Sequence, residues 1–122
     1  MIEEKLNNRG KGKAYEQIAC QFLESNGLKV IEKNFSCRIG EIDIILKDGD
    51  TYVFTEVKYR KNVKYGNPYE AVTKYKMKKI SRVSLYYINY KKLPMNGSFR
   101  FDVVSILDGE ITWYKNAFPY TK

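Results

Sequence analysis

Three residues near the middle of the chain have the types and spacing of a metal-dependent hydrolytic site. Asp43 lies in one strand-like run, and Glu56 and Lys58 lie in the next. If Gly49 and Asp50 form a two-residue hairpin loop, counting back along both strands places Asp43 opposite Glu56. Lys58 then shares their face, because strand side chains alternate. Facing carboxylates repel each other, so the pattern predicts a bound hard divalent cation.

This trio suits phosphodiester hydrolysis, which needs an activated water and stabilisation of developing negative charge. Divalent ions held by carboxylates supply both, and a nearby lysine can orient or deprotonate the water. The alternative is an ordinary surface salt-bridge cluster. The sequence has no histidine, which excludes His-based nucleases and Ser-His-Asp hydrolases. It also has no Walker A or GxGxxG motif, which argues against an NTPase or a dinucleotide enzyme.

Length and composition predict one globular domain over residues 1–122. Hydrophobic residues make up 43% of the chain and aromatic residues 15%, which argues against disorder. No apolar run approaches the length of a membrane span and no basic-then-apolar leader is present, so we expect no membrane partner and a cytoplasmic location. Cys20 and Cys37 lack CxxC spacing, and we expect both to be reduced.

The positive charge of the chain is concentrated in one segment. The formal net charge is +8, and residues 58–92 contain 11 of the 22 Lys and Arg residues with a single acid, Glu70. Tyrosines interleaved with these lysines favour a nucleic-acid-binding face, because aromatic rings stack on bases. A solvated lysine-rich face and a docking surface for an acidic protein are the alternatives. The candidate nucleic-acid-binding residues are Arg60, Lys61, Lys64, Tyr65, Lys74, Lys76 and Lys79.

Hydrophobic periodicity and turn residues predict both helices and strands along the chain. We expect residues 1–9 and 119–122 to be loose. The predicted helices cover residues 13–26 and 70–92, and the predicted strands cover residues 28–35, 39–47, 51–59, 99–107 and 110–114. We expect the tail from residue 115 to be irregular.

Two charged residues lie at informative positions on the predicted helices. The apolar stripe of the first helix centres near Ile18 and Phe22, and Glu16 falls on its border. Glu16 could reach a neighbouring site or serve as a first-turn acid favoured by the helix dipole. Lys76 lies inside the core stripe of the second helix, so it needs an acidic or phosphate partner, or a stem long enough to reach water.

The order of these motifs resembles that of a known family. The motifs are a helix with Glu16, then Gly40-Glu41-Ile42-Asp43, then Phe54-Thr55-Glu56-Val57-Lys58-Tyr59-Arg60, then a lysine-rich helix and Arg100-Phe101-Asp102-Val103-Val104. Together they resemble the YraN-like family, a bacterial branch of the restriction-endonuclease-like PD-(D/E)xK superfamily that is similar to archaeal Holliday junction resolvases. The likeness covers about residues 10–118. Ile42 stands where the superfamily motif has proline.

The resemblance implies a restriction-endonuclease-like α/β core, with a central mixed β-sheet flanked by helices. It implies Mg²⁺ or Mn²⁺ bound by Asp43 and Glu56, Lys58 beside the attacking water, and Glu16 completing the acidic cluster. It also implies a branched or structured DNA substrate and a homodimer. We therefore expect a metal-dependent DNA endonuclease with Glu16, Asp43, Glu56 and Lys58 as catalytic residues. The alternative is a non-catalytic nucleic-acid-binding module on the same fold.

Overall fold

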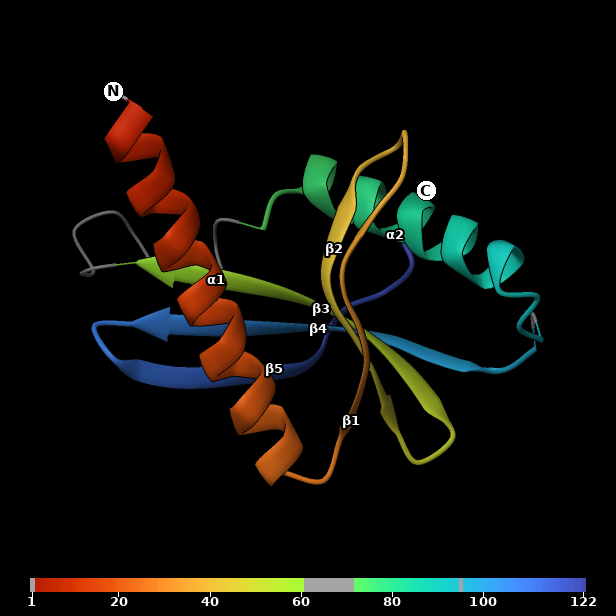
Figure 1. Cartoon of the computed structure of the whole chain (residues 1–122). Helices are drawn as coiled ribbons and strands as arrows, with labels where there is room; N and C mark the ends of the chain where they lie inside the picture. Colours follow the sequence, from red (N-terminus) through yellow and green to blue (C-terminus); the bar gives the residue numbers. More distant parts are fainter. Residues whose placement is uncertain (1, 61–71, 95) are drawn as a thin grey trace.

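Two helices lie on opposite faces of one five-stranded sheet (Figure 1). The structure, a computed structural model, describes the backbone of residues 2–60, 72–94 and 96–122, and within these ranges the side chains of all residues except 2–11 and 60. The elements are α1 (Ile2–Ser25), β1 (Lys29–Ser36), β2 (Glu41–Asp48), β3 (Thr51–Arg60), α2 (Lys74–Tyr90), β4 (Ser98–Leu107) and β5 (Glu110–Phe118). In this part of the chain, neither helix has both the length and the apolar character needed to cross a bilayer.

The sheet is mixed, as predicted. Its strand order is β1-β2-β3-β4-β5; β3 and β4 are parallel, and the other neighbouring pairs are antiparallel. A parallel pair needs a crossover connection, and α2 lies on this connection between β3 and β4. In Figure 1 the β1–β2 hairpin passes between the two helices and runs across the direction of β3, β4 and β5. This twist brings the start of β2 close to both helices.

Each face of the sheet has its own hydrophobic core. Under α1, the buried side chains are Ala19, Cys20, Leu23, Leu28, Ile44, Leu46, Val53, Val104 and Ile106. Under α2, they are Ile42, Ile45, Phe54, Val72, Ile80, Val83, Tyr87, Ile88, Phe101, Val103 and Phe118. Neighbouring residues of the central strands, such as Val53 and Phe54, point to opposite cores because strand side chains alternate. The sheet is therefore covered on both faces.

The turn between β2 and β3 has the predicted geometry. Asp48 pairs with Thr51, so Gly49 and Asp50 form a two-residue loop. Gly49 has a φ of 61°, a value that glycine adopts without steric cost. A positive φ at the first loop residue is typical of a type II′ turn, which matches the twist of the flanking strands. This turn sets the register on which the predicted site depends.

The buried face of α1 differs from the predicted one. Ile18, expected at the centre of the stripe, is 39% exposed, whereas Ala19, Cys20 and Leu23 are almost fully buried. The helix is rotated so that its small residues meet the sheet, which allows a close approach. Glu16 precedes buried Cys20 by one helical turn, so it lies on the sheet-facing side. The rotation directs Glu16 towards the sheet more strongly than its border position predicted.

Several element boundaries also differ from the predictions. Helix α1 begins at Ile2 rather than near residue 13, because a glycine costs a helix only about 1 kcal/mol and the flanking residues are good helix formers. Helix α2 begins at Lys74 rather than residue 70, and Thr73 is its N-cap, with its side chain accepting a hydrogen bond from the Lys76 N–H. Strand β5 continues to Phe118 instead of ending near residue 114.

Candidate metal centre

The candidate site forms where β2 and β3 separate. Their pairing ends at Ile44 and Thr55, one position before the predicted Asp43–Glu56 pair. Beyond this point the Asp43 side chain replaces a β2 backbone carbonyl as the partner of β3, because its Oδ2 accepts a hydrogen bond from the Val57 N–H at 2.8 Å. The hydrogen bond fixes the Asp43 carboxylate beside β3 while β2 continues along β1.

Three carboxylates converge at this separation. Glu16, Glu41 and Asp43 each offer an oxygen, and these oxygens lie within 4.8 Å of one another. Glu16 comes from α1, whereas Glu41 and Asp43 come from one face of β2; we call the three residues the acidic cluster. Glu41 was not among the predicted site residues. Its position two residues before Asp43 was the available signal, since alternation places the two side chains on the same face.

Glu56 lies next to the acidic cluster and is paired with two lysines. Its Oε1 is 2.8 Å from the Lys76 Nζ and 3.7 Å from the Lys58 Nζ. Its side chain is only 6% exposed, and its Oε2 is buried without a hydrogen-bond partner in the described part of the protein. Of the alternatives left open for Lys76, the structure shows an acidic partner, so α2 contributes a cation directly to the site.

The electrostatic environment favours the protonated form of the carboxyls. Burial and the nearby charge of Glu56 raise the pKa of Asp43 from 3.8 to about 8, although the Val57 hydrogen bond opposes the shift. Burial also raises the pKa of Glu16, and a hydrogen bond with the Asn34 side chain partly offsets this effect. A divalent cation beside these carboxylates would lower both pKa values.

The two lysines respond to the site in opposite directions. Burial lowers the pKa of Lys58, and the nearby charge of Lys76 adds to this effect. Burial alone would also lower the pKa of Lys76, but its attraction to Glu56 outweighs burial and raises it. Lys76 is therefore held as an ammonium, whereas Lys58 is the better candidate for exchanging a proton with water.

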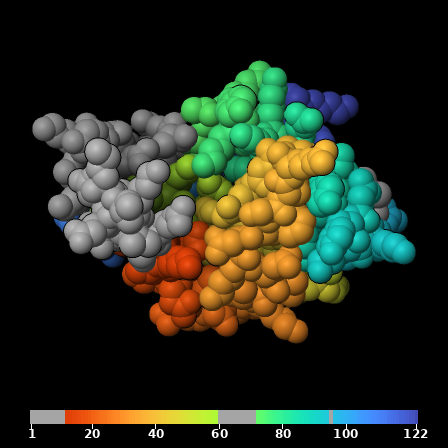
Figure 2. Space-filling model, turned by 45° about the horizontal axis from the view of Figure 1, so that its top comes forward, coloured from red at the N-terminus to blue at the C-terminus, as the bar shows by residue number. Residues whose placement is uncertain are grey.

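The site opens to solvent through a pocket of about 470 Å³, which we call the site pocket. Its lining residues are Gly40, Glu41, Asp43, Glu56, Tyr75, Lys76, Lys79 and Ile80. Figure 2 shows the surface where α1, the β1–β2 region and the start of α2 meet around a recess. This volume exceeds that of a phosphate group, and residues of both charge signs line the pocket.

The predicted nucleic-acid-binding residues are distributed unevenly. Lys76 and Lys79 line the site pocket. Lys74, the first residue of α2, is exposed and does not line this pocket. The predictions for Arg60, Lys61, Lys64 and Tyr65 concern side chains outside those that the structure describes.

The residues present fit a hard divalent cation. All the candidate ligands are carboxylate oxygens, which Mg²⁺ and Mn²⁺ prefer over nitrogen or sulfur. The unpartnered Oε2 of Glu56 is a buried acceptor without a donor, a costly state that a cation would relieve. Glu16, Glu41, Asp43 and Glu56 are thus the residues that would hold such an ion.

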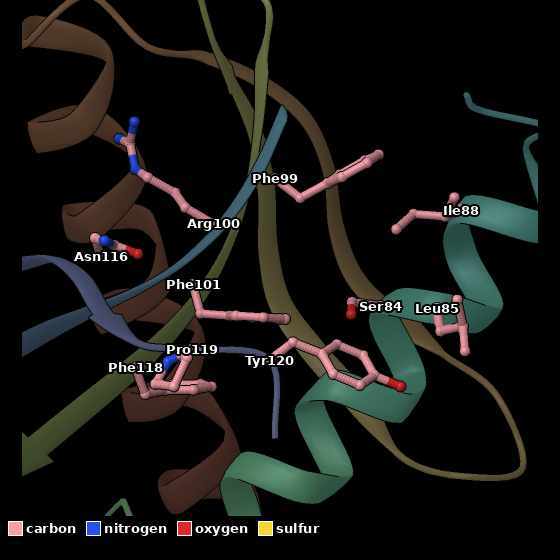
Figure 3. Close-up of a pocket in the computed structure, with 10 residues that line it drawn as sticks. All are labelled: Ser84, Leu85, Ile88, Phe99, Arg100, Phe101, Asn116, Phe118, Pro119 and Tyr120. Carbon is pink, nitrogen blue, oxygen red and sulfur yellow. The ribbon is translucent and has the colours of Figure 1, made fainter. Parts of the chain in front are cut away.

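A second cavity, of about 410 Å³, lies between α2 and the C-terminal part of the sheet (Figure 3). Apolar side chains line most of it, among them Ile88, Phe99, Phe101 and Tyr120. In Figure 3 the Arg100 side chain points away from these residues. Because this cavity lacks carboxylates, it does not offer a second site for the same chemistry.

Asp102 in the Arg100-to-Val104 motif has a structural position. It is fully buried and accepts hydrogen bonds from Arg100 Nε at 3.0 Å, Trp113 Nε1 at 2.9 Å and the Asn116 N–H at 2.8 Å. Arg100 also binds Asp48 at 2.9 Å. The pairing of β4 with β5 shifts beside Asp102, and Asn116 has a φ of 54°. Asp102 therefore stabilises the irregularity in the β4–β5 pairing, beyond which β5 continues to Phe118.

Comparison with known proteins agrees with the family resemblance of the motifs. The profile of the "Uncharacterised protein family UPF0102" matches residues 15–106. A UPF0102 protein of Aliivibrio fischeri (strain MJ11) is 44% identical over 119 residues, covering 95% of this chain and 97% of the relative. A UPF0102 protein of Syntrophus aciditrophicus is 47% identical over 106 residues, covering 87% and 83%. The chain therefore belongs to the UPF0102 family, the YraN-like family that its motifs resemble.

Proposed function

We propose that this protein is a Mg²⁺- or Mn²⁺-dependent nuclease that hydrolyses phosphodiester bonds in DNA. The observation that carries the proposal is the acidic cluster, whose oxygens lie within 4.8 Å of one another and beside Glu56 and Lys58. Basic side chains from α2 border the same pocket, as binding of a polyanion requires. When bound, a divalent ion would polarise a phosphoryl oxygen and increase the acidity of a water molecule.

Each residue of the site has a distinct role in this proposal. Asp43 and Glu56 would hold the ion from adjacent strands, Glu41 from the same face of β2 as Asp43, and Glu16 from α1. Lys58 orients the attacking water or accepts its proton, a role that its lowered pKa supports. Lys76 is a positioning residue that balances the charge of Glu56 at 2.8 Å.

The motif resemblance extends the proposal to the substrate and the assembly. It places the family in the restriction-endonuclease-like superfamily, whose core the mixed sheet and its two covering helices match in architecture. On this basis we propose branched or structured DNA as the substrate and a homodimer as the active form. Both can be measured directly.

One observation favours a non-catalytic nucleic-acid-binding module instead. Glu56 is already neutralised by Lys76 in the absence of a metal ion, so the surface can attract a phosphate without one. In that case Asp43→Asn and Glu56→Gln would leave both the DNA affinity and the function in cells unchanged. A loss of function without a loss of affinity would support catalysis.

Cleavage assays with purified protein test the proposal. Fluorescently labelled four-way junctions, flaps, duplexes and single strands are incubated with Mg²⁺, with Mn²⁺ or with EDTA. We expect cleavage of at least one substrate with either ion and none with EDTA. Asp43→Asn, Glu56→Gln and Lys58→Met should remove cleavage, whereas Glu24→Gln, at an exposed position of α1, should retain it. Cleavage by wild-type protein in EDTA, or the absence of cleavage on every substrate, would overturn the proposal.

A further inference from the structure

A second, strongly basic pocket of about 500 Å³ adjoins the site pocket. We call it the basic pocket; its polar lining consists of Arg38, Tyr75, Lys78, Lys79, Arg82 and Lys122. Five of these residues are cationic, and no acid is among the described residues that line it. Arg38 comes from the turn between β1 and β2, and Lys78 and Arg82 lie one helical turn apart on α2. Clustered cations without carboxylates are suited to phosphate groups rather than to a metal ion.

Tyr75 and Lys79 join the two pockets, because both residues line each of them. The Lys79 stem lies over Gly40 at the entrance to β2, where a Cβ would be 3.4 Å from the Lys79 Cγ. The Lys79 Nζ is 5.3 Å from the centroid of the Tyr75 ring, a cation–π distance. A polymer that leaves the site pocket towards the basic pocket must therefore pass this tyrosine.

Tyr75 is 71% exposed. Among the large hydrophobic side chains that the structure describes, this is the largest exposed fraction. The other exposed tyrosines of α2 differ in their surroundings: Tyr86 and Tyr90 stack on each other, with ring centroids 6.2 Å apart. Tyr75 instead stands between carboxylates and a row of cations. An aromatic ring in a basic groove is how proteins bind the bases of an unpaired strand.

We propose that a single-stranded segment of nucleic acid runs from the site pocket into the basic pocket, with one base stacked on Tyr75 and the adjoining phosphates bound by Arg38, Lys78 and Arg82. A duplex does not fit this arrangement, because each base of a duplex is already covered by its neighbours. The inference rests on the proposed nuclease function and narrows its substrate to DNA that is unpaired on one side of the cleavage point.

Binding measured without cleavage tests the stacking step. Fluorescence anisotropy in EDTA compares a labelled single strand of about 15 nucleotides, near the upper site size of small binding domains, with the same strand in a duplex. We expect wild-type protein to prefer the single strand. Tyr75→Ala should weaken single-strand binding between about 5-fold and 150-fold and affect the duplex less, whereas Tyr75→Phe should bind as wild type does. The matched control is Tyr90→Ala, since Tyr90 is 63% exposed at the other end of α2.

The phosphate contacts have their own readout. The double variant Arg38→Gln/Arg82→Gln should reduce the slope of log affinity against log salt concentration by about 1.4, the value for two single-strand phosphate contacts. The control of equal charge is Lys29→Gln/Lys47→Gln, a pair of facing residues at the other end of the β1–β2 ladder. The control should retain the wild-type slope.

Two results would overturn the inference: Tyr75→Ala binding the single strand as tightly as wild type, or the two double variants having equal salt slopes. A wild-type protein that binds the single strand through Tyr75 but cuts no DNA would support the inference and overturn the nuclease proposal. Cleavage of DNA with no effect of Tyr75→Ala on binding would support the nuclease and overturn the inference.

Discussion

Replacing Asp43 by asparagine should stabilise the metal-free protein at alkaline pH while removing its response to a divalent ion. The Asp43 carboxyl is largely buried, lies near Glu56, and has its pKa raised from 3.8 to about 8. Asparagine has nearly the same shape, and its Oδ1 can accept the Val57 hydrogen bond that Asp43 Oδ2 accepts at 2.8 Å. The substitution therefore removes the charge and keeps the contact.

The sign of the effect follows from proton binding. Between about pH 4 and pH 8 the unfolded chain has lost the Asp43 proton and the folded chain keeps it, so stability falls as pH rises through this window. A shift of four pKa units would correspond to about 5 kcal/mol. Because the site pocket is open to water and Lys58 lies nearby, we expect a smaller effect, about 1–3 kcal/mol.

Urea denaturation in EDTA measures the difference between Asp43→Asn and wild type. At pH 4.5 the two free energies of unfolding should agree within about 0.5 kcal/mol, and at pH 9 the variant should be the more stable by about 1–3 kcal/mol. At pH 7.5, Mg²⁺ at 100 times its dissociation constant should stabilise wild type by about 2.7 kcal/mol and leave the variant almost unchanged. Glu24→Gln, at an exposed position, should show neither effect.

Two results would refute this reasoning. Equal destabilisation of Asp43→Asn at both pH values would mean that the charge of Asp43 does not determine its contribution to stability. Equal stabilisation of the variant and wild type by Mg²⁺ would mean that Asp43 is not a ligand.

Three further substitutions test other parts of the site. Lys76→Met should raise the Mg²⁺ affinity about fivefold in calorimetry, because it frees Glu56 from a partly exposed ion pair worth about 1 kcal/mol; an unchanged affinity would contradict this. Gly40→Ala should leave single-strand affinity unchanged, since the new Cβ would be 3.4 Å from Lys79, whereas Gly40→Val should weaken it by displacing that stem; equal effects would speak against the Lys79 contact. Asp102→Ala should lower the free energy of unfolding by about 3 kcal/mol in urea, because it removes one of the two acidic partners of Arg100 and the acceptor for Trp113 Nε1 and the Asn116 N–H, and should keep the Mg²⁺ affinity; a folded variant that no longer binds Mg²⁺ would refute the structural role.

The hairpin was predictable because its register depends on local rules. The Gly49-Asp50 turn allows one pairing of β2 with β3, and the period of two then assigns every side chain to a face. These local rules do not predict where β2 and β3 separate. That point depends on how β2 twists towards α1 and α2, and it places the Asp43 carboxylate in contact with the Val57 backbone.

The contributions of the helices were less predictable. Hydrophobicity placed Ile18 at the centre of the buried face of α1, but close packing against the sheet favoured the smaller Ala19 and Cys20. For Lys76, the helical period showed that the side chain faces the sheet. The choice between an acidic partner and a path to water depended on where α2 crosses β3, which no local pattern encodes.

In the metal-free protein, positive groups partly offset the negative charge of the site carboxylates. In the metal-free protein, a proton on Asp43 and the ammonium of Lys76 offset carboxylates that would repel DNA. The cationic side chains of the basic pocket, next to the site pocket, attract the phosphates of a strand. A strand can therefore bind before a metal ion neutralises the acidic cluster. Because metal ligation requires ionised carboxylates, ion binding at neutral pH should release a proton from Asp43. We therefore expect the Mg²⁺ affinity to rise with pH up to about pH 8, whereas single-strand binding in EDTA should weaken over the same range as Asp43 loses its proton.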